Sequence, residues 1–373
     1  MERIGILGGT FNPVHNEHVA LAISAVKELN LSALFVMPTL ISPHKTAVPE
    51  SATDRLNMLE RAFSGKDKII VSDFEILNSG KSYTYLTVEH FKKETNAELY
   101  FIFGADMLID FKTRRYPERI LKACKLAVFG RDECFADYEK EKEYFNKTWG
   151  QDFTRLSYVG KNCSSTKVRI YSEFGLSLEG LAPKSVSDYI KENGLYKPDR
   201  YVEYVKGVLN EKRLTHTANV VITALSKAKS LGLDANKVKI CATLHDVAKY
   251  LDYKDYPDFI LPDGVPAPVV HAFLGAYVAE TALKIKDEEI LDAIRFHTSG
   301  KAQMSTLAKL IFVADMIEEG RDYQGVDELR KSFLEDDFDE CFVKCLKEEF
   351  IHLVNKGQYI YEQTLNAFAY YVK

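Results

Sequence analysis

The sequence predicts an α/β domain with a doubly wound parallel sheet, followed by an all-α domain. In the first half, short apolar runs alternate with segments of helical periodicity, whereas the second half has helical periodicity alone. The change occurs at Tyr196-Lys197-Pro198-Asp199, where a proline and flanking charges interrupt the pattern. The 373 residues are enough for two or three domains. We therefore expect two domains, residues 1–198 and 199–373.

Five apolar runs in the first half have the length of strands that are covered on both faces of a sheet. Between the first two runs, Val19–Leu29 carries apolar residues at helical spacing. Repeated alternation of strand, helix and strand is typical of a parallel sheet. We expect strands at Arg3–Leu7, Leu34–Met37, Ile69–Val71, Leu99–Phe103 and Leu126–Phe129.

The second half shows no strand pattern. Its long interruptions are two proline-rich loops, around Pro257 and over residues 262–268. We expect helices at Tyr201–Leu209, Ala218–Leu231, Val238–Leu251, Val269–Ile285, Glu288–His297, Leu307–Ile317 and Phe338–Val354.

Composition narrows the class of protein. Hydrophobic residues make up 46% and charged residues 28%, which is ordinary globular composition. A net charge of -5 argues against a broad nucleic-acid surface, and no apolar run is long enough for a membrane span. The six cysteines form no C-x-x-C pair, and the N-terminus lacks the features of a signal peptide. We expect a cytoplasmic protein with small-molecule partners, without nucleic-acid or membrane partners, and leave a homo-oligomer open.

The first candidate site is the glycine-rich turn after the first expected strand. Gly8 and Gly9 let the backbone approach a ligand closely, and a helix is expected to begin near His18. The free N–H groups at a helix start bind anions. His15 and His18 are three residues apart, so in a first helical turn they would share a face. Two imidazole donors beside such a site favour stabilisation of a transferring phosphoryl group.

With these residues the sequence resembles the H-x-G-H nucleotidyltransferase superfamily, specifically the bacterial nicotinate-nucleotide adenylyltransferases. Four further segments carry the resemblance, which extends from Met1 to Tyr196: residues 42–45, 82–84, 104–107 and 163–169. It implies a Rossmann-like domain, adenylyl transfer from ATP to nicotinate mononucleotide with Mg²⁺ on the triphosphate, and catalytic roles for His15 and His18. It implies ATP- or substrate-binding roles for Gly8, Gly9, Thr10, Phe11, His44, Lys45, Tyr83, Thr84, Gly104, Asp106, Arg114, Ser164, Ser165, Thr166 and Arg169.

Three positions depart from that family's pattern. Glu17 stands where the family has a glycine, and Asn12 where it more often has an aspartate. Arg114-Arg115 stands in place of a Trp-Tyr pair that contacts the nicotinate ring. Arginine can stack on a ring and pair with a carboxylate, so recognition can persist in altered form. Nicotinamide mononucleotide and phosphopantetheine therefore stay open as alternative acceptors.

The second candidate site comprises four histidines and two aspartates of the second half. They come from separate expected helices or helix ends and lie on apolar faces, which point inward. Burying so many polar groups unpaired would be very costly, so a metal centre is predicted. Zinc alone would need only three or four ligands. Six mixed ligands suit two divalent ions with one bridging carboxylate, and they are His216, His245, Asp246, His271, His297 and Asp315.

These residues resemble the H…HD…H…H…D pattern of the HD-domain phosphohydrolases. Over residues 202–373 the match is closer to the symmetrical diadenosine tetraphosphate hydrolases, which have a di-iron centre. The resemblance implies hydrolysis of diadenosine tetraphosphate and other dinucleoside polyphosphates at two divalent metals, with iron expected. Lys249 follows His245 by four residues and is a candidate to neutralise phosphoryl charge. The alternatives are a general HD nucleotidase and a nucleotide-sensing module without catalysis.

Overall fold

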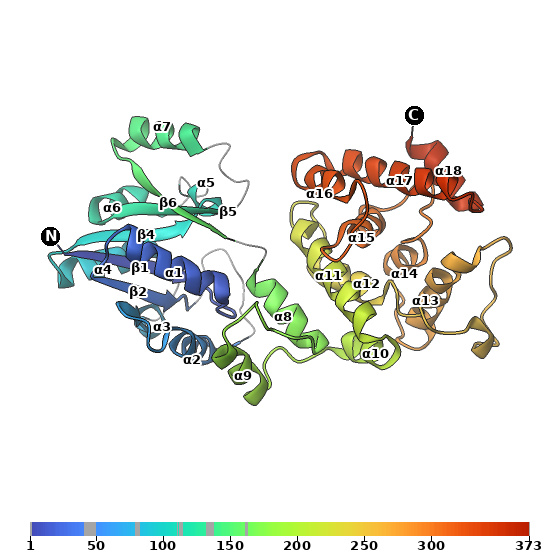
Figure 1. Cartoon of the computed structure of the whole chain (residues 1–373), viewed down its shortest axis with the longest axis horizontal. Helices are drawn as coiled ribbons and strands as arrows, with labels where there is room; N and C mark the ends of the chain where they lie inside the picture. The colour runs from blue at the N-terminus through green and yellow to red at the C-terminus, as the bar shows by residue number, and fades with distance from the viewer. Residues whose placement is uncertain are drawn as a thin grey trace. The chain divides into compact units, whose positions relative to one another are not determined.

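The computed structural model of the chain describes residues 2–40, 50–78, 83–109, 111, 115–131, 138–160 and 163–372. It divides into two compact units. The first unit comprises residues 1–169 and 177–196, and the second comprises residues 170–176 and 197–373 (Figure 1). The predicted fold class is confirmed, because the first unit contains a parallel sheet and the second is helical.

The sheet of the first unit has six parallel strands in the order β3-β2-β1-β4-β5-β6. All five predicted strands are present. The sequence prediction missed β6, an edge strand whose residues after Phe153 are mostly polar and partly exposed. The strands are β1 Arg3–Gly9, β2 Ala33–Pro38, β3 Ile69–Val71, β4 Glu98–Gly104, β5 Lys125–Arg131 and β6 Phe153–Gly160.

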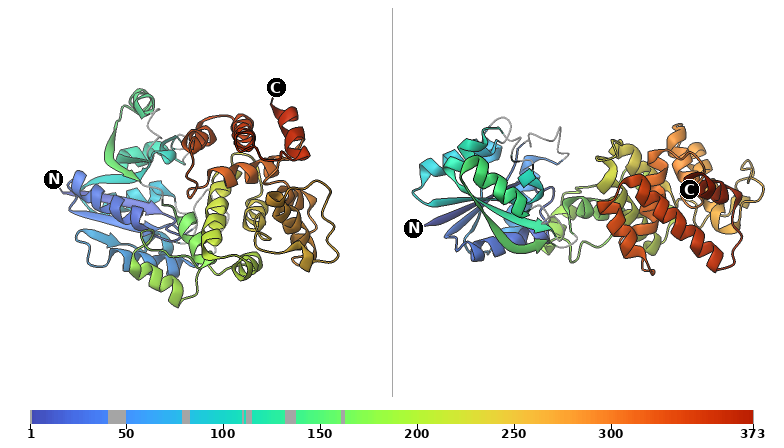
Figure 2. Two further views of the ribbon diagram at one scale, coloured as in Figure 1. Left: turned by 45° about the vertical axis from the view of Figure 1, so that its right-hand side comes forward. Right: turned by 90° about the horizontal axis from the view of Figure 1, so that it is seen from above.

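Helices cover both faces of this sheet (Figure 2). Side chains of α1, α2 and α9 form one hydrophobic core with the sheet, and side chains of α4, α6 and α7 form the other. This arrangement is typical of a doubly wound α/β domain. The helices are α1 Asn16–Glu28, α2 Ala52–Phe63, α3 Phe74–Leu77, α4 Thr84–Glu94, α5 Asp106–Ile109, α6 Pro117–Ala123, α7 Tyr138–Trp149, α8 Ser165–Phe174 and α9 Lys184–Glu192.

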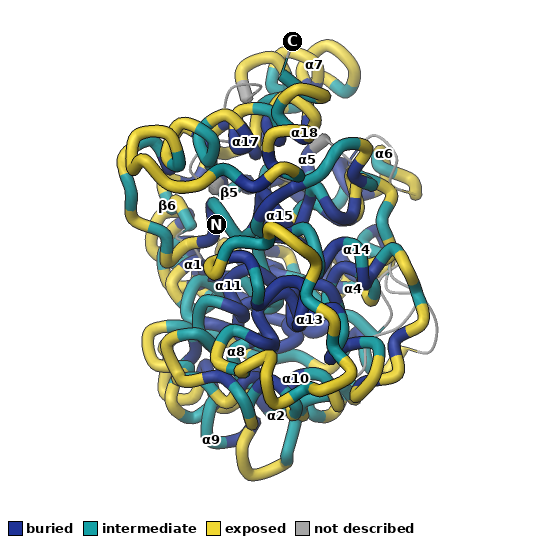
Figure 3. Tube along the Cα trace, turned by 90° about the vertical axis from the view of Figure 1, so that its right-hand side faces the viewer, coloured by how far each residue is buried: buried dark blue, intermediate teal, exposed yellow. Residues whose placement is uncertain are grey.

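The second unit packs its helices around one hydrophobic core. Most residues of α13 and α15 are buried, whereas α11 is buried along one face only and many of the connecting loops are exposed (Figure 3). The elements are α10 Arg200–Val208, α11 Glu211–Ala228, α12 Ala235–Leu244, η2 Tyr253–Asp255, η3 Ala267–Val269, α13 Val270–Thr281, α14 Glu288–Arg295, α15 Thr306–Ile317, α16 Val326–Glu335, α17 Phe338–Asn355 and α18 Glu362–Tyr371.

All seven predicted helices of this unit are present, and α16 and α18 were not predicted. Several predicted ends are wrong: α12 ends at Leu244 instead of Leu251, α13 at Thr281 instead of Ile285, and α14 at Arg295 instead of His297. Helix α11 begins at Glu211, well before the predicted Ala218. The turn after α12 still buries apolar side chains, such as Val247 and Ala248. The apolar pattern in the sequence therefore continues beyond the last helical residue, which made the predicted helix too long. No helix in the described part of the chain is long and apolar enough to cross a lipid bilayer.

Candidate functional site

The strand order of the sheet reverses between β1 and β4, which are neighbours at its centre. In open α/β sheets, ligands bind outside the carboxyl ends of the strands at such a point. Gly8 and Gly9 end β1, and Gly104 ends β4, so three predicted residues lie at this edge. A Cβ atom added at Gly8 would meet no atom within 4 Å, whereas one at Gly9 would lie 3.0 Å from the ring of Phe11. The glycines therefore leave space above the edge and allow Phe11 to pack.

His15 and His18 lie at the start of α1, with their ring centroids 3.7 Å apart. His15 is extended and caps the helix, so it does not belong to the first helical turn. The backbone N–H of His15 donates to Nδ1 of His18 at 3.2 Å. This reciprocal cap, rather than a shared helical face, brings the two imidazoles together.

Glu17, the unusual carboxylate between the two histidines, accepts a hydrogen bond from the hydroxyl of Tyr158 on β6. Burial and this hydrogen bond raise the pKa of Tyr158, so the phenol keeps its proton and remains a donor. The Glu17 side chain is thereby directed onto the sheet. This contact accounts for how a carboxylate is accommodated beside a predicted anion site.

Two arginines hold the loop between β1 and α1. Arg55 is 1% exposed, and its Nη1 donates to the carbonyl oxygens of Thr10 at 2.9 Å and Thr39 at 2.7 Å. Arg169 donates from Nη1 to the carbonyl oxygen of Asn12 at 2.5 Å and from Nη2 to Oγ1 of Thr166 at 3.1 Å. The predicted phosphate-binding helix α8 is thus tied to the predicted glycine-rich turn.

Helix α8 contributes a second tie, because Oγ of Ser165 donates to the carbonyl oxygen of Pro13 at 2.9 Å. Ser164 precedes the helix and accepts from the backbone N–H of Lys167 at 3.2 Å, as an N-cap residue does. Sequence reasoning missed Arg55. The available signal was its helical spacing with Met58, Leu59 and Ala62, which places it on the buried face of α2.

The remaining predicted residues of this site lie in or near the segments between strands. Tyr83 caps α4 and Thr84 is its first residue, so both lie at a helix N-terminus. His44, Lys45 and Arg114 lie outside the described residues, and the side chain of Asp106 is likewise not described.

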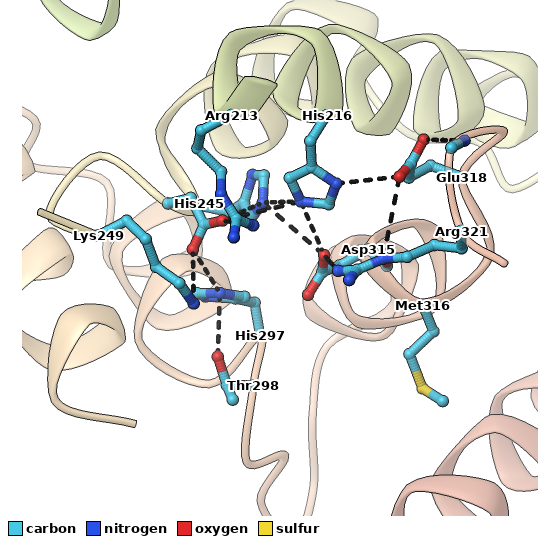
Figure 4. Close-up of polar contacts among 12 residues, drawn as sticks. Arg213, His216, His245, Lys249, His297, Thr298, Asp315, Met316, Glu318 and Arg321 are labelled. Atoms are coloured by element: carbon cyan, nitrogen blue, oxygen red, sulfur yellow. Dashed lines mark hydrogen bonds and ion pairs between the residues drawn. The ribbon is translucent and has the colours of Figure 1, made fainter. Parts of the chain in front are cut away.

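The second unit brings together all six predicted metal ligands (Figure 4). His216 comes from α11, His271 from α13 and Asp315 from α15. His245 and His297 lie just past the ends of α12 and α14, and Asp246 follows His245 in the turn. The residues His216, His245, Asp246, His271, His297 and Asp315 thus converge from five helices or helix ends.

The carboxylate of Asp246 lies between two pairs of histidines. Its Oδ1 is 3.0 Å from Nε2 of His271 and 3.7 Å from Nε2 of His297. Its Oδ2 is 3.5 Å from Nε2 of His245 and 3.7 Å from Nε2 of His216. Each carboxylate oxygen therefore faces its own histidine pair, which is the geometry of a carboxylate that bridges two cations.

Hydrogen bonds at the far side of the rings fix how the imidazoles point. Nδ1 of His245 donates to the carbonyl oxygen of Ala242, and Nδ1 of His297 donates to that of Ile294, both at 2.7 Å. Each Nε2 atom then directs its lone pair toward Asp246. The buried Oδ1 of Asp246 receives no hydrogen bond from any residue that the structure describes. Imidazole lone pairs and an unsatisfied buried carboxylate oxygen are a donor set that fits divalent ions.

The protonation states also fit metal binding, which requires neutral imidazoles and ionised carboxylates. Burial lowers the pKa of His245, and it lowers the pKa of His271 to about 4. Burial would raise the pKa of Asp246, but the neighbouring histidines, His245 first, hold it well below its usual value. His245, His271 and Asp246 are thus ready to bind cations at neutral pH without losing protons. His216 differs, because hydrogen bonds with Asp315 and Glu318 outweigh burial and raise its pKa, so cation binding competes with its proton.

Charged side chains that were not predicted surround the cluster (Figure 4). Arg213 donates to Oδ2 of Asp246 at 2.7 Å, and Arg321 donates to Oδ1 of Asp315. Glu318, only 2% exposed, lies 3.1 Å from Nδ1 of His216. Their signal in the sequence was spacing: Arg213 is three residues before His216, and Glu318 is three residues after Asp315.

Lys249, the predicted catalytic lysine, points into the same cluster. Its Nζ lies 3.6 Å from Oδ1 of Asp246 and 3.3 Å from Nε2 of His271. A pocket of about 260 Å³ opens beside the ligands His297 and Asp315. It is also lined by Thr298, Phe312, Met316, Arg321, Tyr323, Glu348, Glu349 and His352.

In comparisons with known proteins, the two halves of the chain match two different families. The cytidylyltransferase-like family matches residues 6–170, and the HD domain family matches residues 213–320. A probable nicotinate-nucleotide adenylyltransferase of Clostridium botulinum is 38% identical over 204 residues, which cover 53% of this chain and 100% of the relative. A symmetrical bis(5'-nucleosyl)-tetraphosphatase of Bacillus subtilis is 38% identical over 167 residues, 43% of this chain and 89% of that protein.

The chain belongs to the nicotinate-nucleotide adenylyltransferase family and to the symmetrical bis(5'-nucleosyl)-tetraphosphatase family. A probable nicotinate-nucleotide adenylyltransferase/Ap4A hydrolase of Mycoplasma genitalium is 28% identical over 329 residues, which cover 86% of this chain and 88% of that protein. The resemblances predicted from the sequence are therefore confirmed for the adenylyltransferase domain and for the HD domain. The HD domain also has the His and Asp cluster of a divalent-metal site.

Proposed function

We propose that the chain is a bifunctional enzyme. Its adenylyltransferase domain transfers AMP from ATP to nicotinate mononucleotide and releases pyrophosphate. Its HD domain hydrolyses diadenosine tetraphosphate symmetrically to two ADP. The observation that carries the proposal is that a relative of each activity is covered over nearly its whole length by one part of this chain.

In the adenylyltransferase domain, a phosphate oxygen of nicotinate mononucleotide attacks the α-phosphorus of ATP, and the bond from that phosphorus to pyrophosphate breaks. The imidazoles of His15 and His18, which lie side by side at the start of α1, donate to the phosphate oxygens as their charge grows. Thr166 and Arg169 bind the phosphates of ATP, which enters with Mg²⁺. The reaction needs no covalent enzyme intermediate.

In the HD domain, the six clustered side chains would hold two divalent ions, with iron as the expected metal. When bound, such ions lower the pKa of a coordinated water and polarise a phosphate group. Asp246 shares its two oxygens between the two histidine pairs. Lys249 places a cation 3.6 Å from Asp246, on the side of His271, where it neutralises phosphate charge. Arg321 lines the pocket beside His297 and Asp315, where its guanidinium offers a cation to substrate phosphate.

Product analysis of the purified full-length chain tests both activities. With ATP and nicotinate mononucleotide we expect deamido-NAD and pyrophosphate, and with diadenosine tetraphosphate we expect ADP as the only product. Parallel reactions with nicotinamide mononucleotide and phosphopantetheine test the alternative acceptors. Formation of AMP and ATP from diadenosine tetraphosphate would contradict symmetrical hydrolysis. Binding of the nucleotide without turnover, in metal-loaded protein, would favour a sensor.

A further inference from the structure

Helix α8 begins in the adenylyltransferase domain, and its last turns lie in the HD domain. Residues 170–176 belong to the HD unit, where Ile170 and Phe174 are buried in the hydrophobic core. Tyr171 packs against the same core, and its hydroxyl donates to Oδ1 of Asn219 on α11 at 2.9 Å. A helix that starts at the predicted ATP site thus brings a hydrogen-bond donor to the helix that carries a predicted metal ligand.

Asn219 connects Tyr171 to that ligand, His216. Asn219 is only 6% exposed and follows His216 on α11 by three residues, so both side chains lie on one side of the helix. Both contact the buried carboxylate of Glu318. Burial would raise the pKa of Glu318, but hydrogen bonds from His216 and from the side chain of Asn219 hold it below its usual value. The carboxylate is therefore ionised and accepts from both side chains.

The hydrogen bonds of this chain lead to one carboxylate. The phenol of Tyr171 donates to Asn219, whose amide donates to Glu318. Burial raises the pKa of Tyr171, so its hydroxyl keeps its proton and remains a donor. Nδ1 of His216 lies 3.1 Å from Oε1 of Glu318, and because a carboxylate only accepts, this nitrogen carries a proton (Figure 4). Nε2 of His216 then faces the cluster, 3.0 Å from Oδ1 of Asp315.

We propose that Tyr171 is a positioning residue of the metal centre. By fixing Asn219 and thereby Glu318, it holds the imidazole of His216 in the orientation that binds a cation. The partner at the far nitrogen of a metal-binding histidine sets the orientation and tautomer of the ring, and a satisfied buried network keeps that partner in one arrangement. This inference rests on the proposed metal-dependent hydrolysis. It makes the HD site depend on a helix in which Arg169, predicted to bind ATP, lies two residues before Tyr171.

Tyr171→Phe tests the proposal in the full-length protein, because it removes the hydroxyl and keeps the ring. The helix should stay in place, since Ile170 and Phe174 remain buried. Glu173 also still pairs with Lys239 on α12, at 2.6 Å. The metal-free protein is titrated with Co²⁺ in competition with a chelating indicator. We expect one of the two Co²⁺ equivalents to bind about 3- to 10-fold more weakly, the scale of one lost hydrogen bond, and the other to be nearly unchanged.

A double-variant cycle separates positioning from a general effect on the fold. Glu318→Gln interrupts the chain between Asn219 and His216, so adding Tyr171→Phe to it should weaken Co²⁺ binding little further. If the hydroxyl of Tyr171 only stabilised the HD core, its loss would have the same effect in both backgrounds. Additive effects of the two substitutions would therefore overturn the inference.

Tyr371→Phe is the matched control. Tyr371 packs against the same core, and its hydroxyl accepts from the backbone N–H of Met304 at 2.6 Å, outside this chain of hydrogen bonds. The control should keep the wild-type affinities for Co²⁺. Wild-type affinities in Tyr171→Phe, or equal weakening of both equivalents, overturn this inference alone. Wild-type protein that binds no Co²⁺ overturns the metal centre, and with it both the proposed hydrolysis and this inference.

Discussion

Replacing Asp246 by asparagine is the sharpest test of the metal centre. The substitution keeps the shape of the side chain but removes its charge and one of its acceptor oxygens. In the fold, the two oxygens of Asp246 lie 3.0–3.7 Å from the Nε2 atoms of four histidines. A change at one residue should therefore weaken both cation sites together.

The expected magnitude separates a bridging ligand from a residue that only orients His245. Loss of an orienting partner typically costs about 10- to 100-fold in metal affinity or activity. Loss of a charge shared by both ions should exceed this, and we expect hydrolysis to fall by about 1,000-fold or more. Adenylyl transfer should stay at the wild-type rate, because the adenylyltransferase domain contains its own site.

The assay combines elemental analysis of the dialysed protein with the rate of hydrolysis of diadenosine tetraphosphate. Glu318→Gln is the matched control, because Glu318 contacts Nδ1 of His216 at 3.1 Å and does not face the centre of the cluster. It should lose only about 10- to 100-fold in affinity. An Asp246→Asn protein that retains two equivalents of metal per chain would refute the bridging role.

Three further predictions concern other parts of the chain. His18→Ala should lower the rate of adenylyl transfer by about 100-fold or more, with a much smaller change in nucleotide affinity. Hydrolysis of diadenosine tetraphosphate should not change. Near-normal turnover in adenylyl transfer would exclude the catalytic role of His18. The metal-free protein should lose stability as the pH falls from 6.5 toward about 4, because burial lowers the pKa of His271 and only the unfolded chain takes up that proton in this window. His271→Gln should remove this part of the pH dependence of Tm, and an unchanged profile would argue against it. An HD fragment that begins at residue 170 should be more stable than one that begins at residue 199, by about 3 kcal/mol or more, because it keeps the buried Ile170 and Phe174. Equal denaturant midpoints of the two fragments would contradict this.

Much of the fold follows from apolar periodicity. The runs that form the four inner strands β2, β1, β4 and β5 are nearly continuous apolar segments, since both faces are covered. The short edge strand β3 is also apolar, Ile-Ile-Val, and was predicted for that reason. Strand β6 has one neighbour and many exposed positions, so it lacks that pattern. The six clustered side chains were also predictable, because histidine and aspartate on apolar helix faces must find a common partner.

The contacts that orient those side chains were not predictable from spacing alone. The reciprocal cap between His15 and His18 depends on an extended backbone at His15, which the sequence pattern does not specify. Likewise, the place of Asp246 between two histidine pairs depends on how four other helices and helix ends pack around the turn after α12. A continuous helix would point Asp246 about 100° away from His245.

Helix α8 shows most clearly what a sequence pattern leaves open. Val168, Ile170 and Phe174 are apolar residues of this helix, but their identity alone does not show which core buries each of them. Val168 packs in a core of the adenylyltransferase domain, whereas Ile170 and Phe174 pack in the core of the HD domain. A boundary placed at the change of composition near residue 198 therefore assigns residues 170–176 to the wrong core. The division of the two activities at residue 198 stays a prediction. Any separation of the domains must allow for this helix, because the residues at its start, Thr166 and Arg169, are predicted to bind ATP, while Ile170 and Phe174 pack in the core of the HD domain.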